Sequence, residues 1–409
     1  MTHAHDQSPS IIPTLMLLLA ALLGFMISNS LWSEYYQDFL AAKISFIVGD
    51  YPFLSKSVLH IVNDGLMAIF FLFIGLELKR EIVVGELSNL KKASLPIFSA
   101  IGGMIVPALI YFSFNQAPGA RNGWGIPMAT DIAFALGLLS MLGPRVPKSL
   151  KVLLAAIAIV DDLGAILVIA FFYTSQIGFG YLLGAFGFFT ICLLFNRIGI
   201  NKLSLYVAVG IPLWYCMLKS GVHATIAGVM LASTIPLAPK RKSTAKLLDD
   251  IFSDRASPLD SPAVFLEKSL LKWVNYLILP VFAFSNAGVQ LGNVSFGSIS
   301  LGVILGLTLG KPIGIAGIAW IASKLNLVDK PRGTTWSHII GLGFLAGIGF
   351  TMSLFIGSLA FTEEIHFNEA KLAIIIASSL SAIFGSFLLL YLLPKQSLNP
   401  PSSEEKPEQ

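Results

Sequence analysis

Long apolar stretches recur along almost the whole chain, and each is long enough to cross about 30 Å of lipid hydrocarbon as a helix. Of the 409 residues, 55% are hydrophobic and only 12% are charged, whereas a water-soluble domain carries about 25% charged residues. Such a chain has too few charges to cover a water-facing surface, so we predict an all-α polytopic membrane protein. The net charge of +4 is small, and nucleic acid is not expected as a partner.

Twelve transmembrane helices are expected from the positions of these stretches. Their ranges are 11–31, 58–78, 95–114, 125–142, 147–173, 180–196, 203–218, 222–236, 273–288, 300–322, 335–360 and 370–393. Together they make one transmembrane domain over residues 11–393. Residues 1–10 are expected to form a short N-terminal tail, and residues 394–409, rich in Pro and Glu, a disordered C-terminal tail.

The distribution of basic residues predicts the orientation of these helices. With residues 1–10 placed in the cytoplasm, 21 of the 27 Lys and Arg residues fall in cytoplasmic segments and 5 fall outside. The remaining one, Lys311, lies inside a span. Such a bias is what the positive-inside rule requires. Both termini are therefore predicted to be cytoplasmic.

Two segments outside the spans are long enough to have a structure of their own. Residues 32–57 form an external loop in which Ile44–Val48, followed by Gly49, predicts a small β-hairpin. Residues 237–272 begin with basic residues, continue with acidic residues and prolines, and are interpreted as a solvated cytoplasmic linker between two halves of the chain.

Four ionisable residues stand near the middle of predicted spans: Asp131, Asp161, Asp162 and Lys311. A charged residue at the centre of a membrane helix costs about 2.5–3.5 kcal/mol, so such residues mark functional sites by default. Three carboxylates cannot all be satisfied by one lysine. Asp161 and Asp162 are adjacent, so their side chains leave the helix about 100° apart, and one can face Lys311 while the other faces a cavity.

Two predicted spans also contain sequences that break a helix. Pro127 precedes the polar pair Thr130-Asp131, and Gly347-Ile348-Gly349 occupies the middle of span 335–360. Unwound backbone at membrane depth is tolerated only where it lines a cavity, although paired glycines can also be packing notches. The two breaks lie in spans of opposite direction, which suggests an inverted repeat of spans 3–5 and 10–12, with discontinuous helices 4 and 11 crossing at the midplane.

The chain resembles the bacterial NhaA-type sodium/proton antiporters from about residue 10 to residue 393. The motifs that carry the resemblance are Gly75-Leu76-Glu77-Leu78-Lys79-Arg80-Glu81, Ala129-Thr130-Asp131-Ile132-Ala133-Phe134, Asp161-Asp162-Leu163-Gly164-Ala165-Ile166, Lys219-Ser220-Gly221-Val222-His223-Ala224-Thr225, Gly310-Lys311-Pro312 and Gly347-Ile348-Gly349-Phe350-Thr351. The resemblance implies a pH-regulated, electrogenic exchanger of the bacterial inner membrane that binds no cofactor and forms a homodimer, with the loop 32–57 suggested as the contact.

The resemblance also implies roles for particular residues. Asp162 matches the principal ion ligand, Asp161 shares the site and can pair with Lys311, and Thr130 and Asp131 match the unwound segment beside it. Positions tied to pH control near a cytoplasmic funnel match Glu77, Arg80, Glu81, His223 and Glu267. The segment around Glu267 lacks histidines that some relatives carry, so the pH dependence is expected to differ.

The chemistry of these residues agrees with that implication. Na+ and Li+ are hard cations that prefer oxygen ligands, and Asp161, Asp162 and Thr130 offer only oxygen. Burial disfavours the charged forms of the aspartates and of Lys311, so the same carboxylates can hold either protons or a sodium ion. That competition would couple an outward flow of sodium to an inward flow of protons.

Other readings of the same residues stay open at this point. The four buried charges could be an ion pair that only locks helices together, or part of a carrier that binds an organic anion through Lys311. An intramembrane aspartyl protease needs its two aspartates on separate helices, and a cation channel would not place a lysine in its path. Glu77, Arg80 and Glu81 could be a plain solvated salt bridge, and His223 could be a packing histidine.

Overall fold

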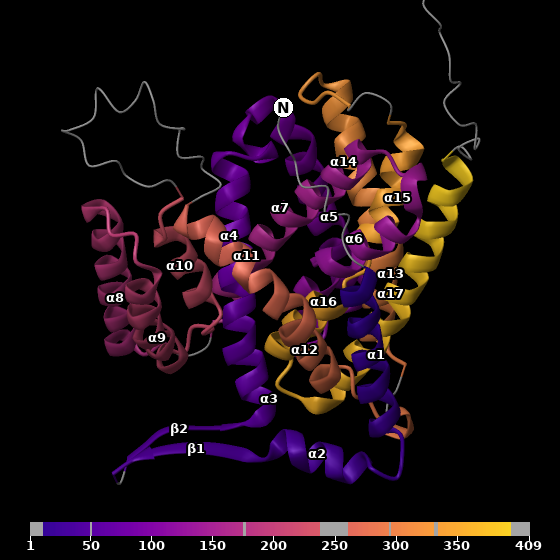
Figure 1. Cartoon of the computed structure of the whole chain (residues 1–409). Helices are drawn as coiled ribbons and strands as arrows, with labels where there is room; N and C mark the ends of the chain where they lie inside the picture. The colour runs from indigo at the N-terminus through magenta and orange to yellow at the C-terminus, as the bar shows by residue number, and fades with distance from the viewer. Residues whose placement is uncertain are drawn as a thin grey trace, which may run out of the picture.

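The computed structural model describes residues 11–49, 51–174, 177–237, 261–293, 296–330 and 334–393, and these are predominantly helical. Eight helical segments are long and apolar enough to cross a membrane, and two bent helix pairs raise the number to as many as ten. The chain is therefore a multi-pass membrane protein built from a bundle of helices (Figure 1).

The eight unbroken segments follow the predicted ranges closely, and the short π-helical turns η1 and η9 interrupt the regular helix in two of them. In chain order the eight are α1 (Ile11–Ser28), α3–η1–α4 (Val58–Ile61, Val62–Leu66 and Met67–Val83), α5 (Leu90–Phe114), α7 (Lys148–Phe172), α8 (Phe179–Ile198), α9 (Leu203–Ser220), α13–η9–α14 (Ser298–Leu305, Gly306–Gly310 and Lys311–Lys324) and α17 (Glu364–Leu392).

Two of the predicted spans are each broken into two helices. The range 125–142 corresponds to η3 (Ala120–Met128) followed by α6 (Ile132–Met141), with a bend of 41° between them. The range 335–360 corresponds to α15 (Trp336–Ala346) followed by α16 (Phe350–Ala360), with a bend of 51°. Both breaks lie where Pro127 and the paired glycines predict an interruption of the helix.

The predicted hairpin is confirmed. Strand β1 (Lys43–Val48) pairs antiparallel with β2 (Tyr51–Ser57), with Lys43 opposite Ser57 at the open end and an irregularity of register between Phe46 and Ile47. The short helix α2 (Ser33–Ala41) precedes it. Figure 1 shows this ribbon lying across one end of the helix bundle.

Two predicted boundaries are wrong. The range 222–236 contains only the nine-residue helix α10 (Ile226–Thr234), which at 1.5 Å per residue is roughly 13 Å long, too short to cross the hydrocarbon alone. The linker does not extend to residue 272, because α11 (Pro262–Trp273) continues through η7 (Val274–Ile278) into α12 (Leu279–Asn286).

The helix α11 begins early for a local reason. The Ser261 hydroxyl accepts a hydrogen bond from the backbone N–H of Val264, and Pro262 occupies the first turn, where its missing N–H carries no cost. The rest of the predicted linker, residues 238–260, and both predicted tails lie outside the described residues. The remaining short turns are η2 (Glu86–Ser88), η4 (Gly143–Arg145) and η8 (Leu291–Asn293).

A backbone-to-backbone contact positions Lys311 in the bundle. Helices α5 and α14 approach so closely that a Cβ added to Gly102 would lie 2.0 Å from the carbonyl oxygen of Gly314, and the reverse substitution would meet Gly102 at 2.1 Å. Small residues allow membrane helices to pack at this distance. The Lys311 side chain, three residues before Gly314, is fully buried beside this crossing.

Candidate functional site

The two broken helix pairs bond to each other at their breaks. The backbone N–H of Asp131 donates to the carbonyl of Ile348 at 2.7 Å, and the Thr130 hydroxyl lies 2.8 Å from the carbonyl of Ala346. Each break therefore supplies partners for backbone groups that the other leaves unpaired. Unwound backbone in hydrocarbon is stable only when its polar groups are satisfied in this way.

Asp131 stabilises the beginnings of two half-helices. Its Oδ1 accepts from the N–H of Phe134 at 3.0 Å and so caps α6. Its Oδ2 accepts from the N–H of Thr351 at 3.1 Å and from the Thr351 hydroxyl at 2.5 Å, in the first turn of α16. Helix N-termini carry positive partial charge, so a carboxylate is favourable there. Both oxygens of Asp131 are engaged.

Asp161, Thr130 and Lys311 form a second buried cluster. The Nζ of Lys311 pairs with Oδ2 of Asp161 and also donates to the Thr130 hydroxyl at 2.9 Å. The Thr130 hydroxyl lies 2.6 Å from the same Asp161 oxygen. Exposed fractions are 0% for Thr130 and Lys311 and 1% for Asp161. The cluster joins the break before α6 to the middle of α7 and to the start of α14.

Asp162 differs from its neighbours because nothing in the described part of the chain satisfies it. Both of its carboxylate oxygens, and Oδ1 of Asp161, are buried without a hydrogen-bond partner among the described residues. An ionised carboxylate buried without a partner costs several kcal/mol. These three oxygens therefore require a proton or a cation, and an all-oxygen donor set suits a hard cation such as Na+.

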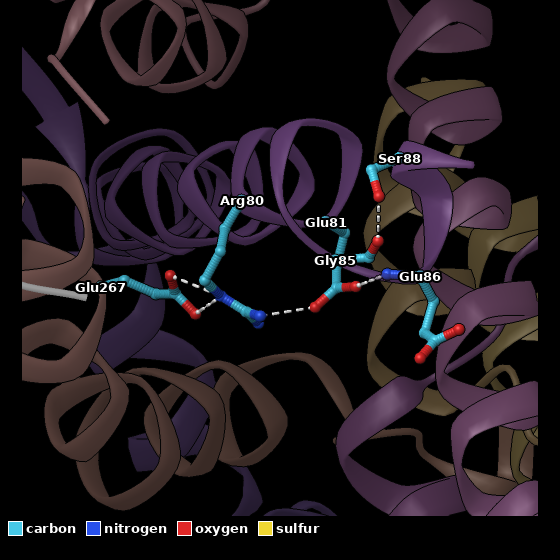
Figure 2. A network of polar contacts seen from close by, with 6 residues as sticks. All are labelled: Arg80, Glu81, Gly85, Glu86, Ser88 and Glu267. Atoms are coloured by element: carbon cyan, nitrogen blue, oxygen red, sulfur yellow. Dashed lines mark hydrogen bonds and ion pairs between the residues drawn. The ribbon is translucent and has the colours of Figure 1, made fainter. Parts of the chain in front are cut away.

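A separate polar network lies at the C-terminal end of α4 (Figure 2). The Nε of Arg80 donates to both oxygens of Glu267 at 3.0 and 3.1 Å, and its Nη1 lies 2.5 Å from Oε1 of Glu81. The other Glu81 oxygen accepts from the N–H of Glu86 at 3.0 Å. Arg80 thus joins α4 to α11 across 187 residues of sequence.

Two carboxyls near Arg80, one inside this network and one beside it, differ from the others in their surroundings. Burial raises the pKa of the Glu267 carboxyl, and the Arg80 guanidinium opposes that rise. Glu77 lies one helical turn before Arg80, and no hydrogen bond or ion pair joins it to another described residue. The network is therefore partly desolvated and differs from a solvated surface salt bridge.

Among the described residues, no hydrogen bond or ion pair joins His223 to this network, and its role in pH control stays a prediction. Its Nε2 lies 2.7 Å from the carbonyl oxygen of Tyr173, just before α10 begins. Lys79, next to Arg80, instead donates to the carbonyl of Ser233 at 2.7 Å, at the opposite end of α10.

Sequence reasoning also missed partners of the central site. Thr351 and the carbonyls of Ala346 and Ile348 all contact the Thr130-Asp131 segment. The position of Thr351 directly after Gly347-Ile348-Gly349-Phe350 was the available signal, because a hydroxyl beside a helix break is placed to satisfy the freed polar groups.

Substitution of Gly347 is expected to destabilise the break. A Cβ there would lie 2.3 Å from the carbonyl oxygen of Leu307, so backbone must move, and we expect Gly347→Ala to cost about 1–3 kcal/mol. Gly349→Ala should cost less, because its Cβ meets the end of the Ser353 side chain. Thermal unfolding in detergent measures the order, with Gly180→Ala, which meets nothing, as the control; equal melting temperatures would contradict it.

Comparison with known proteins agrees with this geometry. The profile of the family described as Na+/H+ antiporter 1 matches residues 7–389. The chain is 47% identical to the Na(+)/H(+) antiporter NhaA 2 of Flavobacterium johnsoniae, covering 92% of this chain and 89% of the relative. It is 45% identical to the Na(+)/H(+) antiporter NhaA of Helicobacter acinonychis over 94% of this chain and 93% of that one. The chain therefore belongs to the Na+/H+ antiporter 1 family of sodium/proton exchangers.

Proposed function

We propose that this antiporter exports cytoplasmic Na+ or Li+ in exchange for external protons, with Asp162 and Asp161 as the ion ligands. The observation that carries the proposal is the set of three buried carboxylate oxygens without partners, beside Lys311 and between two broken helices. Thr130 completes the oxygen set, and Asp131, whose own oxygens are engaged, holds the two half-helices in place.

Exchange follows from competition for the same oxygens. When the site faces outward, Asp162 takes up a proton, and either Asp161 or Lys311 takes up a second. After access switches to the cytoplasm, a sodium ion displaces both protons, and Lys311 releases Asp161 so that its carboxylate can bind the ion. Two protons for one sodium move one net charge, worth about 2.3 kcal/mol per 100 mV of membrane potential.

The charge balance is tested by the reversal potential of sodium flux. In proteoliposomes clamped with K+ and valinomycin, ²²Na+ flux should stop at the voltage at which two protons balance one sodium. A sodium flux that does not depend on the voltage would contradict electrogenic exchange. It would leave the competition between proton and sodium in place.

The architecture we propose has twelve membrane helices. The two bent pairs are taken as spans 4 and 11. Residues 222–236, which include α10 and the turns beside it, and residues 273–288, which include η7 and α12, are taken as spans 8 and 9. An inverted repeat of spans 3–5 and 10–12 would cross the broken spans at the bilayer midplane. The hydrogen bonds between the two breaks support this, and so does Ser378 on α17, whose hydroxyl accepts from the N–H of Phe350 at the start of α16.

The surroundings of the protein are part of the same proposal. The bias of basic residues supports cytoplasmic termini in a bacterial inner membrane. A homodimer through residues 32–57 is supported by the hairpin, whose ribbon lies across one end of the bundle (Figure 1). We propose that no cofactor takes part, because exchange needs only the two ions and the site residues.

The Arg80 network is proposed to regulate exchange by pH, with Glu77, Glu81 and Glu267 as its acids. Because the pKa of Glu267 is raised, its ion pair with Arg80 is complete above that pKa and is lost as pH falls through it. The network can therefore change the contact between α4 and α11 as the Glu267 carboxyl gains or loses its proton. His223, bonded to Tyr173, would act on pH dependence only from a separate place.

Glu267→Gln should shift the pH profile of exchange. The amide imitates the protonated acid, so we expect the pH of half-maximal activity to rise by about half to one unit. Glu86→Gln is the matched control, since the Glu86 carboxylate faces Lys92 and not Arg80. The profile is measured in inside-out vesicles between pH 6 and 9. An unshifted profile would remove Glu267 from the proposed regulation.

The alternative of an anion carrier is not favoured by the site. The ammonium of Lys311 is already bonded to Asp161 and Thr130 and is surrounded by carboxylates. An anion would have to displace these bonds next to the unpaired oxygens of Asp162. A protease is equally disfavoured, because Asp161 and Asp162 are neighbours on one helix and diverge from it.

A further inference from the structure

An apolar groove runs along the outer face of the pair α14 and α15. Its volume is about 410 Å³, and Leu309, Ile313, Trp320, Trp336 and Ile340 line it. Ile313 and Trp320 are 58% and 49% exposed. Gly317 also lines the groove, and a Cβ added there would meet nothing within 4 Å. In a membrane-spanning chain, such a surface faces lipid.

Two lysines stand at one end of this groove, each beside a tryptophan that lines it. The Nζ of Lys324 lies 5.7 Å from the centre of the Trp320 ring, and the Nζ of Lys330 lies 5.9 Å from that of Trp336. Cations are attracted to aromatic faces at this distance, and Trp is enriched at the membrane–water boundary. The groove is therefore apolar along its length and cationic at the end predicted to be cytoplasmic.

The length of the groove matches one leaflet of the bilayer. From Leu309 to Trp320 the helix rises roughly 16 Å at 1.5 Å per residue, which is about half of the 30 Å hydrocarbon core. Leu309 lies two residues before Lys311, near mid-span, and Trp320 lies one turn before the end of α14. The groove thus extends from the middle of the membrane to its surface.

We propose that this groove binds one anionic phospholipid of the cytoplasmic leaflet, with an acyl chain along α14 and the phosphate between Lys324 and Lys330. Basic sites between membrane helices on the cytoplasmic side are typical of acidic lipid headgroups. The acyl chain of the lipid would lie against Pro312, the residue directly after Lys311. Gly343 of α15 contacts the same proline. A bound lipid would brace α14 against the first half of a broken span. The inference does not depend on the proposed transport mechanism.

Quenching of tryptophan fluorescence by brominated lipids tests the site. The full chain is reconstituted in phosphatidylcholine that contains increasing fractions of brominated phosphatidylglycerol or, in parallel, brominated phosphatidylcholine. We expect phosphatidylglycerol to quench the emission of Trp320 and Trp336 at about tenfold lower mole fraction. Subtracting the emission of the Trp320→Phe/Trp336→Phe variant isolates these two rings from the other tryptophans.

Two further variants separate the headgroup from the acyl chain. Lys324→Gln/Lys330→Gln should abolish the preference for phosphatidylglycerol. Gly317→Leu places a side chain inside the groove and should weaken quenching by both lipids. Gly187→Leu on α8 is the matched control, because a Cβ there also meets nothing within 4 Å. Equal quenching of these two rings by the two lipids would overturn the proposal. So would a preference that survives loss of both lysines.

Discussion

Asp162→Asn is expected to abolish sodium and lithium exchange while the chain still folds. The amide keeps the shape of the side chain but removes the charge from two of the three unpartnered oxygens. Loss of a charged ligand should cost about 3 kcal/mol of cation binding, which is more than hundredfold in exchange at low sodium. The stability should not fall, because no hydrogen bond of the described residues is lost at this position.

The measurement is dequenching of a pH-sensitive dye in inside-out vesicles after addition of NaCl, LiCl or KCl. Melting temperatures in detergent accompany it, so that loss of exchange is separated from loss of fold. Asp38→Asn is the matched control, because Asp38 is exposed on α2 outside the bundle of spans. Exchange that survives in Asp162→Asn would mean that the ion site is placed on the wrong residue.

Lys311→Met should destabilise the protein strongly, and a second substitution should reverse most of the loss. The substitution leaves Asp161 buried without its cation, and breaking a buried pair in this way costs about 3–5 kcal/mol. Adding Asp161→Asn removes the unpaired charge, so the double variant should melt close to the original chain, although neither form should exchange two protons per sodium.

Thermal unfolding of the four forms in one detergent measures this coupling as a double-mutant cycle. Lys202→Met, on an exposed lysine, controls for the loss of a positive charge in general. Additive losses in the double variant would show that the pair seen between Lys311 and Asp161 contributes no coupling energy, and that Lys311 is held only by its packing against α5.

The location of the breaks and of the buried charges could be predicted from sequence, because each feature is local. Each of these features changes the free energy of forming a membrane helix at its own position. They are the proline before Thr130, the paired glycines Gly347 and Gly349, and the charged residues in apolar runs. Adjacent aspartates must diverge on a helix, so only one of the two was expected to face Lys311. The resemblance, and not the spacing, indicated that this one is Asp161.

The contacts between distant segments could not be predicted in the same way. Asp131 and Thr351 are separated by 220 residues, and nothing local to either indicates that one carboxylate caps two half-helices. The same holds for His223 and the carbonyl of Tyr173, which lie 50 residues apart in the sequence. The start of α11 was not predicted, because the charged residues before it led to the interpretation of 237–272 as a linker. The capping residue Ser261 was not used in that interpretation.

The most direct test of the account is the apparent KM for sodium as a function of pH in proteoliposomes. If one set of carboxylates holds either protons or sodium, the KM should rise as pH falls, by about tenfold per unit for each proton displaced, while the maximal rate at saturating sodium changes little. A KM that stays constant across the range, with only the maximal rate changing, would contradict the shared site.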